Sequence, residues 1–292
     1  MDYLSRTGMR PLPKNYAPPE TWHEFNAIEM PPPIARRELV GTDPQGRRWG
    51  IWPLIFEEYV SDSEPDLALS QQQGKLAYPR LVVWKRVARQ DAPQGWHQWR
   101  NKPWRIDGYH ELTSEYLARW NKKARHDLRA WQQQAASGRY AIEGISFEEF
   151  KKAYKHSTVQ KKCGSFFLDI LARKYAHPDT QDTLALWGVR DTHSGNIVAG
   201  TAAHYPIGRD DSLRECPFIL PEARECQAAT GLMHHWFEES MRRGRTRLMF
   251  TYFRQRGDPR SWQGFSTFKS HFATDYVAYP PVLWRLVGGK FF

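Results

Sequence analysis

Apolar residues recur at helical spacing in several stretches after about residue 113. The first of these lies in residues 113–137, where Leu117, Trp120, Ala124, Leu128 and Trp131 step by three or four residues. That spacing places them on one helix face, and Gly138 ends the pattern. The same spacing predicts further helices over 147–156, about 164–175 and 227–244.

Runs of β-branched and aromatic residues, bounded by turn residues, predict strands between these helices. They lie at 79–87, 184–190, 197–205, 246–253 and 276–287. Before them, residues 38–42 and 48–56 read as a hairpin closed by a turn at 43–46. Mixed strands and helices predict an α/β protein, with a β-rich segment ahead of the helical part.

Residues 264–272, "GFSTFKSHF", combine a short aromatic stripe with a single cation. Phe265, Phe268 and Phe272 fall at i, i+3 and i+7, which predicts a short helix. Lys269 lies beside the stripe. From the residues alone, this lysine is either a functional cation held against aromatic rings or a side chain that extends past an aromatic core to water.

Prolines gather at the start of the chain, and positive charge gathers in two later segments. Residues 1–35 hold many prolines, among them the run 31–33, so we expect an extended arm there. The net charge is +10 and the isoelectric point is near 9.5, which favours anionic partners. Residues 75–131 carry 13 Lys or Arg against 5 acidic residues, and residues 242–292 carry 10 against 2.

Several classes of protein are disfavoured. The three cysteines form no C-x-x-C pair, which argues against a disulfide framework or structural zinc and fits a reducing compartment. His234 and His235 are helix neighbours that cannot face one metal, so we predict no metal. The start lacks an apolar signal region, and no run of about 18 apolar residues occurs, so we expect a cytoplasmic protein without a transmembrane segment.

Three segments resemble one protein family. They are "YLARWNKKARHDLRAW", "LALWGVRDTHSGNIVAGTAAHY", and "GLMHHWFEESMRRGRTRLMFTYF" followed by "GFSTFKSHF". Their order is similar to the GNAT acyltransferase fold, and the "FK" ending resembles the Fem-type branch, the aminoacyltransferases of peptidoglycan cross-bridges. After the arm expected over 1–35 from its prolines, the resemblance implies an abbreviated β-rich N-terminal unit over 36–108 and a GNAT-like acyltransferase domain over 109–292.

The family resemblance also implies a reaction. Fem-type enzymes move an aminoacyl group from aminoacyl-tRNA to an amine, through a tetrahedral oxyanion. We therefore expect no cofactor, with aminoacyl-tRNA as co-substrate and an amine-bearing small molecule or cell-wall precursor as acceptor. The loop that holds the coenzyme A pyrophosphate in ordinary GNAT enzymes is glycine-rich, whereas here "EARECQAATGL" has one glycine, Gly231.

Three residues are candidates for the chemistry. In the resembled family the lysine of the "FK" ending lies at the acyl donor, so Lys269 is the candidate to stabilise the oxyanion or hold the donor's terminal phosphate. Tyr252, near the end of the strand predicted over 246–253, is the candidate general acid on the leaving group. Asp258 is the candidate base for the incoming ammonium; a core tyrosine and a simple turn are the alternatives for these two.

Other residues are candidates for binding. The basic helix face and the segment "GWHQWRNKPWR" interleave cations and rings, as nucleic-acid surfaces do. The candidates are Lys122, Lys123, Arg125, Arg129, Trp96, Trp99, Trp104, Arg254, Arg256, Phe265, Phe268 and His204. A solvated basic face is the alternative for the helix, and solvated loop residues are the alternative for Arg254 and Arg256.

Two other functions stay open. An acyl-CoA-dependent N-acyltransferase with acetyl-CoA as donor would use the same fold, because both donors carry phosphates. A non-catalytic nucleic-acid-binding module would use the same basic surface. The leucyl- and arginyl-transferases that tag protein N-termini are disfavoured, because their early cysteine motifs are absent and the first cysteine here is Cys163.

Overall fold

The computed structural model describes residues 46–51, 54–61, 64–65, 80–86, 92–99, 103–176, 178–255, 258 and 260–287. The chain divides into two compact units, and each is described by itself below. One holds Asp107–Tyr276, and the other holds Leu12–Ile106 with Val277–Phe292. The predicted arm at 1–35 and the candidate Arg256 lie outside the described residues.

The unit that contains Leu12–Ile106 has a five-stranded sheet in its described part. Its strands, in sheet order, are β1 (Gly46–Ile51), β2 (Leu54–Ser61), β3 (Arg80–Arg86), β12 (Leu283–Val287) and β4 (His97–Gln98). β1 and β2 form an antiparallel pair, and β12 runs antiparallel to β3. Val82, Trp84, Trp96 and Leu283 are buried together and form its core.

This sheet differs from the sequence expectation in two ways. The predicted single strand over 48–56 is wrong, because its residues belong to β1 and β2, which pair with each other from Ile51 opposite Leu54. The sequence assigned the closing strand to the acyltransferase domain at 109–292, but β12 pairs with β3. Leu283 is fully buried against Val82, Trp84 and Trp96, which gives the physical reason.

The Asp107–Tyr276 unit is built on a seven-stranded sheet in its described part. In sheet order its strands are β11 (Asp275–Ala278), β5 (Ile106–Glu111), β10 (Arg247–Phe250), β9 (Asp211–Ile219), β8 (Ile197–His204), β7 (Leu184–Asp191) and β6 (Tyr140–Gly144). All the strand pairs with a defined register are antiparallel except β9 with β10, which is parallel. The predicted hairpin of 184–190 and 197–205 is confirmed as β7 and β8.

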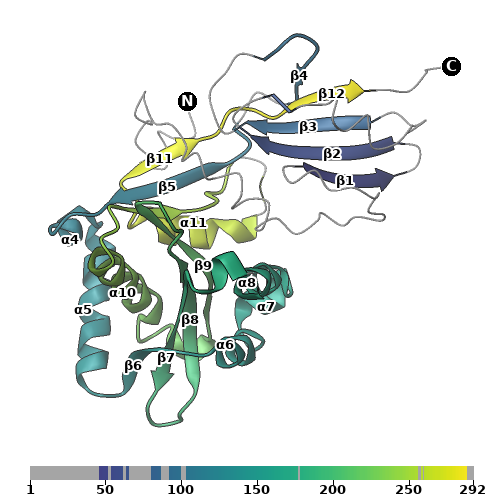
Figure 1. Cartoon of the computed structure of the whole chain (residues 1–292). Coiled ribbons are helices and arrows are strands. Elements are labelled where there is room, and N and C mark those ends of the chain that lie inside the picture. Colours follow the sequence, from purple (N-terminus) through teal and green to yellow (C-terminus); the bar gives the residue numbers. More distant parts are fainter. Residues whose placement is uncertain are drawn as a thin grey trace. The chain divides into compact units, whose positions relative to one another are not determined.

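Helices cover both faces of this sheet. They are α4 (Tyr116–Arg119), α5 (Lys122–Ala136), α6 (Phe147–Tyr154), α7 (Thr158–Cys163), α8 (Phe166–Ala176), α9 (Pro178–Gln181), α10 (Ala228–Arg242) and α11 (Gln263–Ser270). Figure 1 shows α5 and α10 on one side of β7–β9 and α6–α8 on the other. None of the helices in the described ranges has the length and apolar character needed to cross a membrane.

Capping residues set the helix boundaries. Ser146 and Glu149 form a reciprocal capping box that starts α6, as the predicted helix at 147–156 requires. The single helix predicted over 113–137 is instead two helices. Trp120 has extended backbone and ends the short α4, and the Oδ1 of Asn121 accepts the Ala124 N–H at 2.8 Å and caps α5.

A bulge interrupts β9. Between the pairs Gly200–Phe218 and Ala202–Glu215, β8 has one residue where β9 has two. One of the two, Cys216, has a positive φ of 42°. A bulge of this kind bends a strand and redirects the side chains that follow it. Cys216 and Phe218 both pack in the core with Phe150 and Tyr154 of α6.

Candidate functional site

The sheet of the Asp107–Tyr276 unit opens between its two parallel strands. β9 and β10 pair only where Asp211–Leu213 lie beside Arg247–Met249. β9 then continues to Ile219, whereas β10 ends at Phe250. From Arg214 onward β9 has no partner strand on that side among the described residues. An opening between parallel strands, at their carboxyl ends, is where open α/β sheets bind ligands.

A groove of about 290 Å³ lies next to this opening. It is lined by the end of β9, the first turn of α10, the start of α5 and one face of α11. Gln227, before α10, adopts a left-handed conformation with φ of 60°. The N–H groups of Thr230 and Gly231 donate hydrogen bonds to the carbonyl oxygen of Gln227. The first turn of α10 therefore presents the positive end of a 15-residue helix to the groove.

The glycine of this turn serves packing. A Cβ on Gly231 would lie 2.3 Å from the indole of Trp131, closer than any side chain tolerates. Gly231 is thus where α10 approaches α5, and it is buried. It is not a site where the backbone comes close to a phosphate, as the glycines of a nucleotide loop do.

Charged side chains stand at the edge of the groove. Lys123 Nζ lies 2.9 Å from Asp127 Oδ2, and both residues line it. Arg224 lines it too, and its Nη2 donates to Thr158 Oγ1 at 3.3 Å. Burial lowers the pKa of His271, which also lines the groove, and the nearby Lys123 lowers it further.

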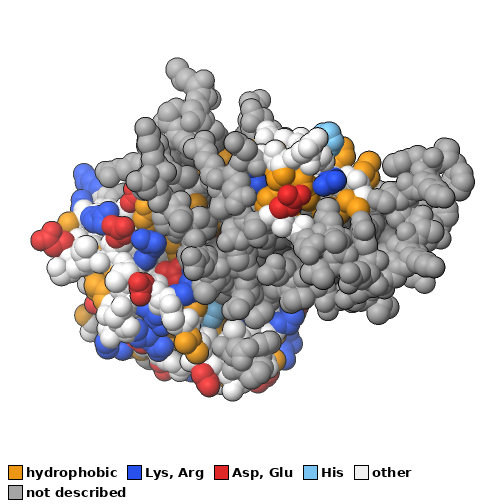
Figure 2. Space-filling model, turned by 45° about the horizontal axis from the view of Figure 1, so that its top comes forward, with side chains coloured by type: hydrophobic (Ala, Val, Ile, Leu, Met, Phe, Trp, Pro, Cys, Tyr) orange, Lys and Arg blue, Asp and Glu red, His pale blue; other side chains and the backbone are white. Residues whose placement is uncertain are grey.

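The other candidates of the basic helix do not line this groove. Lys122, Arg125 and Arg129 are exposed on α5. Arg125 Nη1 donates to the Ala118 carbonyl of α4 at 2.9 Å. On the face in view, Figure 2 shows lysine and arginine side chains interspersed with acidic and apolar ones.

Lys269 is held by the backbone at the end of β10. Its ammonium donates to the carbonyl oxygens of Thr251 and of Tyr252, the latter at 2.8 Å. It also lies 5.0 Å from the centroid of the Phe253 ring and 4.9 Å from that of Phe265. Cation–π contacts of this length fix an ammonium in place. The cation is therefore positioned between two carbonyls and two rings.

The loop after β10 has a defined shape. Tyr252 is left-handed, with φ of 58°, and about a third exposed, and its N–H donates to Asp107 Oδ1 at 2.8 Å. The Arg254 N–H donates to Ser266 Oγ at 2.8 Å. Asp258 Oδ2 accepts the Gln255 N–H at 2.7 Å. The strand predicted over 246–253 thus ends early, and Tyr252 lies in this loop, outside the strand.

The three rings of the aromatic stripe predicted on α11 have different surroundings. Phe268 lines the groove with Gly264, Thr267 and His271. Phe265 is partly exposed beside Lys269. Phe272, just after the helix, is buried edge-to-face against Trp120 at 4.7 Å between ring centroids.

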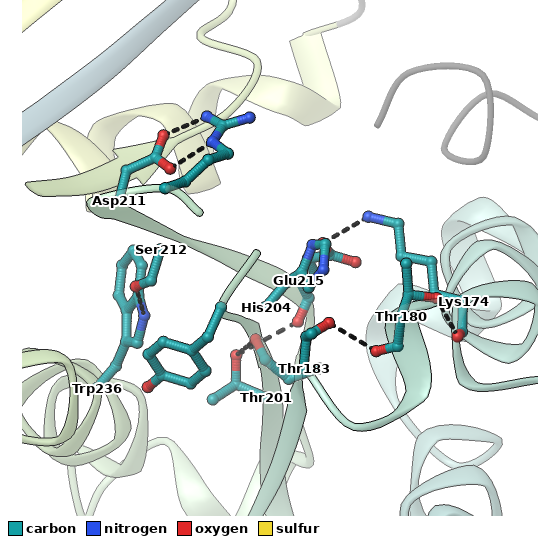
Figure 3. Close-up of polar contacts among 12 residues, drawn as sticks. Lys174, Thr180, Thr183, Thr201, His204, Asp211, Ser212, Glu215 and Trp236 are labelled. Carbon is teal, nitrogen blue, oxygen red and sulfur yellow. Dashed lines mark hydrogen bonds and ion pairs between the residues drawn. The ribbon is translucent and has the colours of Figure 1, made fainter. Parts of the chain in front are cut away.

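His204 lies inside a buried polar cluster on the α8 side of the sheet. Its Nδ1 is 3.7 Å from Glu215 Oε1, which also accepts from Lys174 Nζ at 2.6 Å (Figure 3). Burial, together with Lys174, Arg209 and Arg245, lowers the pKa of His204 to about 2. Its ring is buried and uncharged, and it does not line the groove.

The three tryptophans of "GWHQWRNKPWR" belong to the other unit and have different surroundings. Trp96 is buried, and its Nε1 donates to Glu64 Oε1 at 2.7 Å. Trp104 is partly buried, and its Nε1 donates to the Arg86 carbonyl at 2.8 Å. Trp99 is 50% exposed and lines a surface groove with Leu81 and Trp284. Of the three, Trp99 offers the most ring surface to a ligand.

Sequence reasoning missed the strand that borders the opening. β9 was not predicted, so neither its bulge nor Arg214, the first residue beyond the part that pairs with β10, was considered. A regular apolar alternation could have marked the strand, but "DSLRECPFI" places Arg, Glu and Pro within it.

Comparisons with known proteins agree with this fold. Scans against protein-family models and curated proteins gave no match. Among solved structures the chain is similar to FemX, with a TM-score of 0.63, 11% identity, and coverage of 97% of this chain and 94% of that one. It is similar to L-PGS from Bacillus licheniformis, with a TM-score of 0.53, 13% identity and coverage of 82% and 80%.

A third similar structure is the C-terminal domain of a putative lysylphosphatidylglycerol synthetase from Agrobacterium fabrum. Its TM-score is 0.53 at 11% identity, and the alignment covers 82% of this chain and 79% of that one. Identities this low show the fold. The α/β class and the GNAT-like fold of the Fem-type branch, both expected from the sequence, are confirmed at that level.

Proposed function

We propose that this chain is an acyltransferase that moves an aminoacyl group from aminoacyl-tRNA to an amine acceptor. The observation that carries the proposal is the groove beside the opening of β9 and β10, at the positive end of α10, in a fold shared with FemX. The name of another similar protein, lysylphosphatidylglycerol synthetase, describes an aminoacylated product. Acyl transfer needs two reactants held together more than it needs a nucleophilic side chain.

The reaction forms one bond and breaks one. The amine nitrogen attacks the acyl carbonyl carbon, and a tetrahedral oxyanion forms. The nitrogen releases a proton, the oxyanion collapses, the bond to the donor oxygen breaks, and that oxygen takes a proton. Tyr252 is our candidate proton donor, because it is exposed in the loop directly after β10.

The role of Lys269 in this proposal is electrostatic. Its ammonium is fixed by two carbonyls and two rings, so its charge is in place before a donor binds. A preorganised charge needs no rearrangement when an oxyanion develops. Asp258 already accepts a backbone N–H, which supports a role in shaping the loop; its role as a base stays a prediction.

The start of α10 supports aminoacyl-tRNA as the donor over coenzyme A. The glycine there packs against Trp131, which leaves the helix without the glycine-rich loop that ordinary coenzyme A sites use. The cations Lys123 and Arg224 at the groove suit phosphates of either donor. The amine acceptor, a small molecule or a cell-wall precursor, stays a prediction.

A transfer assay with purified protein tests the proposal. The protein is incubated with a radiolabelled aminoacyl-tRNA pool or with labelled acetyl-CoA, and both filter retention and loss of label to added amines are measured. We expect retention of charged tRNA and amine-dependent deacylation. Consumption of acetyl-CoA alone would identify an acyl-CoA enzyme. Equal binding of uncharged tRNA with neither donor consumed would favour a nucleic-acid-binding module.

A further inference from the structure

Arg214 occupies the point at which the sheet opens. It directly follows Leu213, the last β9 residue paired with β10. Successive side chains of a strand alternate between faces, so Arg214 lies on the same face as Ser212. Ser212 Oγ accepts from Trp236 Nε1 of α10 at 2.7 Å, which identifies the α10 face (Figure 3). The side chain of Arg214 is therefore on the side of the sheet that bears the groove.

The surroundings of Arg214 are aromatic. Its guanidinium carbon lies 5.9 Å from the centroid of Phe268, a ring that lines the groove. Its Nε is buried and has no hydrogen-bond partner. Among the described residues its side chain makes no ion pair. Burial alone lowers the pKa of Arg214 to about 10, and no neighbouring carboxylate opposes this.

Two other arginines of this unit are paired with carboxylates. Arg209 donates to both carboxylate oxygens of Asp211, and Arg243 Nε donates to Glu239 at 2.6 Å. The neighbouring carboxylate, Glu215, is on the opposite face and pairs with Lys174. An unpaired guanidinium that is partly removed from water costs free energy, which an anionic ligand would offset.

We propose that Arg214, which lies next to the groove residue Phe268 and is not itself part of the groove lining, is an anion-binding residue at the opening of the sheet that receives a phosphate or carboxylate group of a substrate. The planar guanidinium matches both groups, because each offers two oxygens to parallel N–H donors. Phe268 holds the guanidinium against its ring, so it limits the orientations that the charge can take. This inference deepens the proposed function and rests on it for the identity of the anion as part of an acyl donor or acceptor.

Isothermal titration of the full chain tests the subsite without any transfer reaction. The probes are inorganic pyrophosphate for the phosphate source and N-acetylglycine for the carboxylate source, at one fixed ionic strength. The variants are Arg214→Gln, Arg214→Lys and the control Arg173→Gln, an exposed arginine of α8. We expect at least one probe to bind the parent and to bind Arg214→Gln about 10-fold or more weakly. Arg173→Gln should match the parent.

The outcomes separate the two proposals. The probe that loses affinity identifies the source of the anion, and Arg214→Lys should retain part of the affinity for pyrophosphate as a point charge. Equal affinities of parent and Arg214→Gln, or no binding of either probe to the parent, would overturn the subsite. Loss of probe binding in Arg214→Gln without any aminoacyl transfer by the parent would keep the subsite and refute the proposed function.

Thermal melting distinguishes a ligand-binding arginine from a structural one. Because Arg214 has no carboxylate partner among the described residues, Arg214→Gln should melt at the same temperature as the parent or higher. The probe that binds should raise the melting temperature of the parent and of Arg173→Gln by the same amount, and that of Arg214→Gln by less. A variant that melts well below the parent, with the probe-induced rise intact, would assign Arg214 a purely structural role.

Discussion

Lys269 combines a structural contact with a proposed catalytic charge, and substitution separates the two. Lys269→Met removes the donors to the Thr251 and Tyr252 carbonyls but keeps most of the apolar stem. We expect the free energy of unfolding to fall by about 1–3 kcal/mol. Turnover in the transfer assay should fall by about 10²–10³-fold, with little change in tRNA affinity.

The control for this prediction is Lys152→Met, an exposed lysine of α6. It should match the parent in both measurements. Unchanged turnover in Lys269→Met would show that the ammonium has no catalytic role and only stabilises the loop after β10.

His110 makes stability depend on pH. It is fully buried on β5, its ring nitrogen Nδ1 lies 2.6 Å from the Phe272 carbonyl, and burial lowers its pKa to about 4. The folded state therefore favours the neutral ring, whereas the unfolded state takes up a proton near pH 6.5. Stability from this group is complete above pH 6.5 and is lost as the pH falls towards 4, by about 1.4 kcal/mol per unit.

Urea unfolding between pH 7 and 5 measures this slope. His110→Asn retains an N–H donor for the Phe272 carbonyl but cannot titrate, so its slope should be smaller by about 1.4 kcal/mol per unit. An unchanged slope would show that His110 accepts a proton in the folded state.

At the level of elements, the close contact between α5 and α10 depends on Gly231, which has no side chain. Gly231→Ala would drive a methyl group into the Trp131 ring, so we expect destabilisation of about 1–3 kcal/mol despite the better helix propensity of alanine. Gly264→Ala in α11 is the matched control, because a Cβ there meets nothing within 4 Å. It should leave stability equal or slightly raised. Equal melting temperatures for the two variants would contradict this packing.

Local signals in the sequence predicted those elements whose causes are local. The capping box of Ser146 and Glu149 starts α6 within four residues, and the turn between β7 and β8 follows its glycine and asparagine. β9 has no such local signal. It forms because it pairs with β8 on one side and β10 on the other, and a bulge at Cys216 interrupts its alternation. One of its charged residues, Glu215, pairs with Lys174, which is 41 residues away in the sequence.

In the candidate site, too, the sequence predicted the features with local causes and missed those that depend on distant contacts. The "FK" segment indicated α11 and Lys269, but periodicity could not show that Phe268 and Phe265 contact different neighbours. Trp96 and Trp99 are three residues apart with similar flanks, yet one is buried and the other exposed. Which ring faces water is decided by strands that pair only in the folded chain.

At the scale of the molecule, the five-stranded sheet depends on a strand from far along the sequence. Leu283 of β12 is fully buried with Val82, Trp84 and Trp96. We expect Leu283→Ala to cost about 2–5 kcal/mol. Hydrogen exchange should quicken in peptides covering 80–86 and 283–287, whereas Leu286→Ala, at an exposed position of the same strand, should leave exchange unchanged. Unaltered exchange in both variants would argue against this pairing.

The position of β12 beside β3 has a consequence for synthesis on the ribosome. The partner strands emerge first, but the strand between β3 and β4 is translated only after the whole Asp107–Tyr276 unit. That unit has all its own strands by then and can acquire structure while the earlier sheet still lacks a member. During this interval Val82 and Trp84 lack their apolar partner Leu283, so a nascent chain stalled before β12 is the form in which we expect chaperones to recognise this protein.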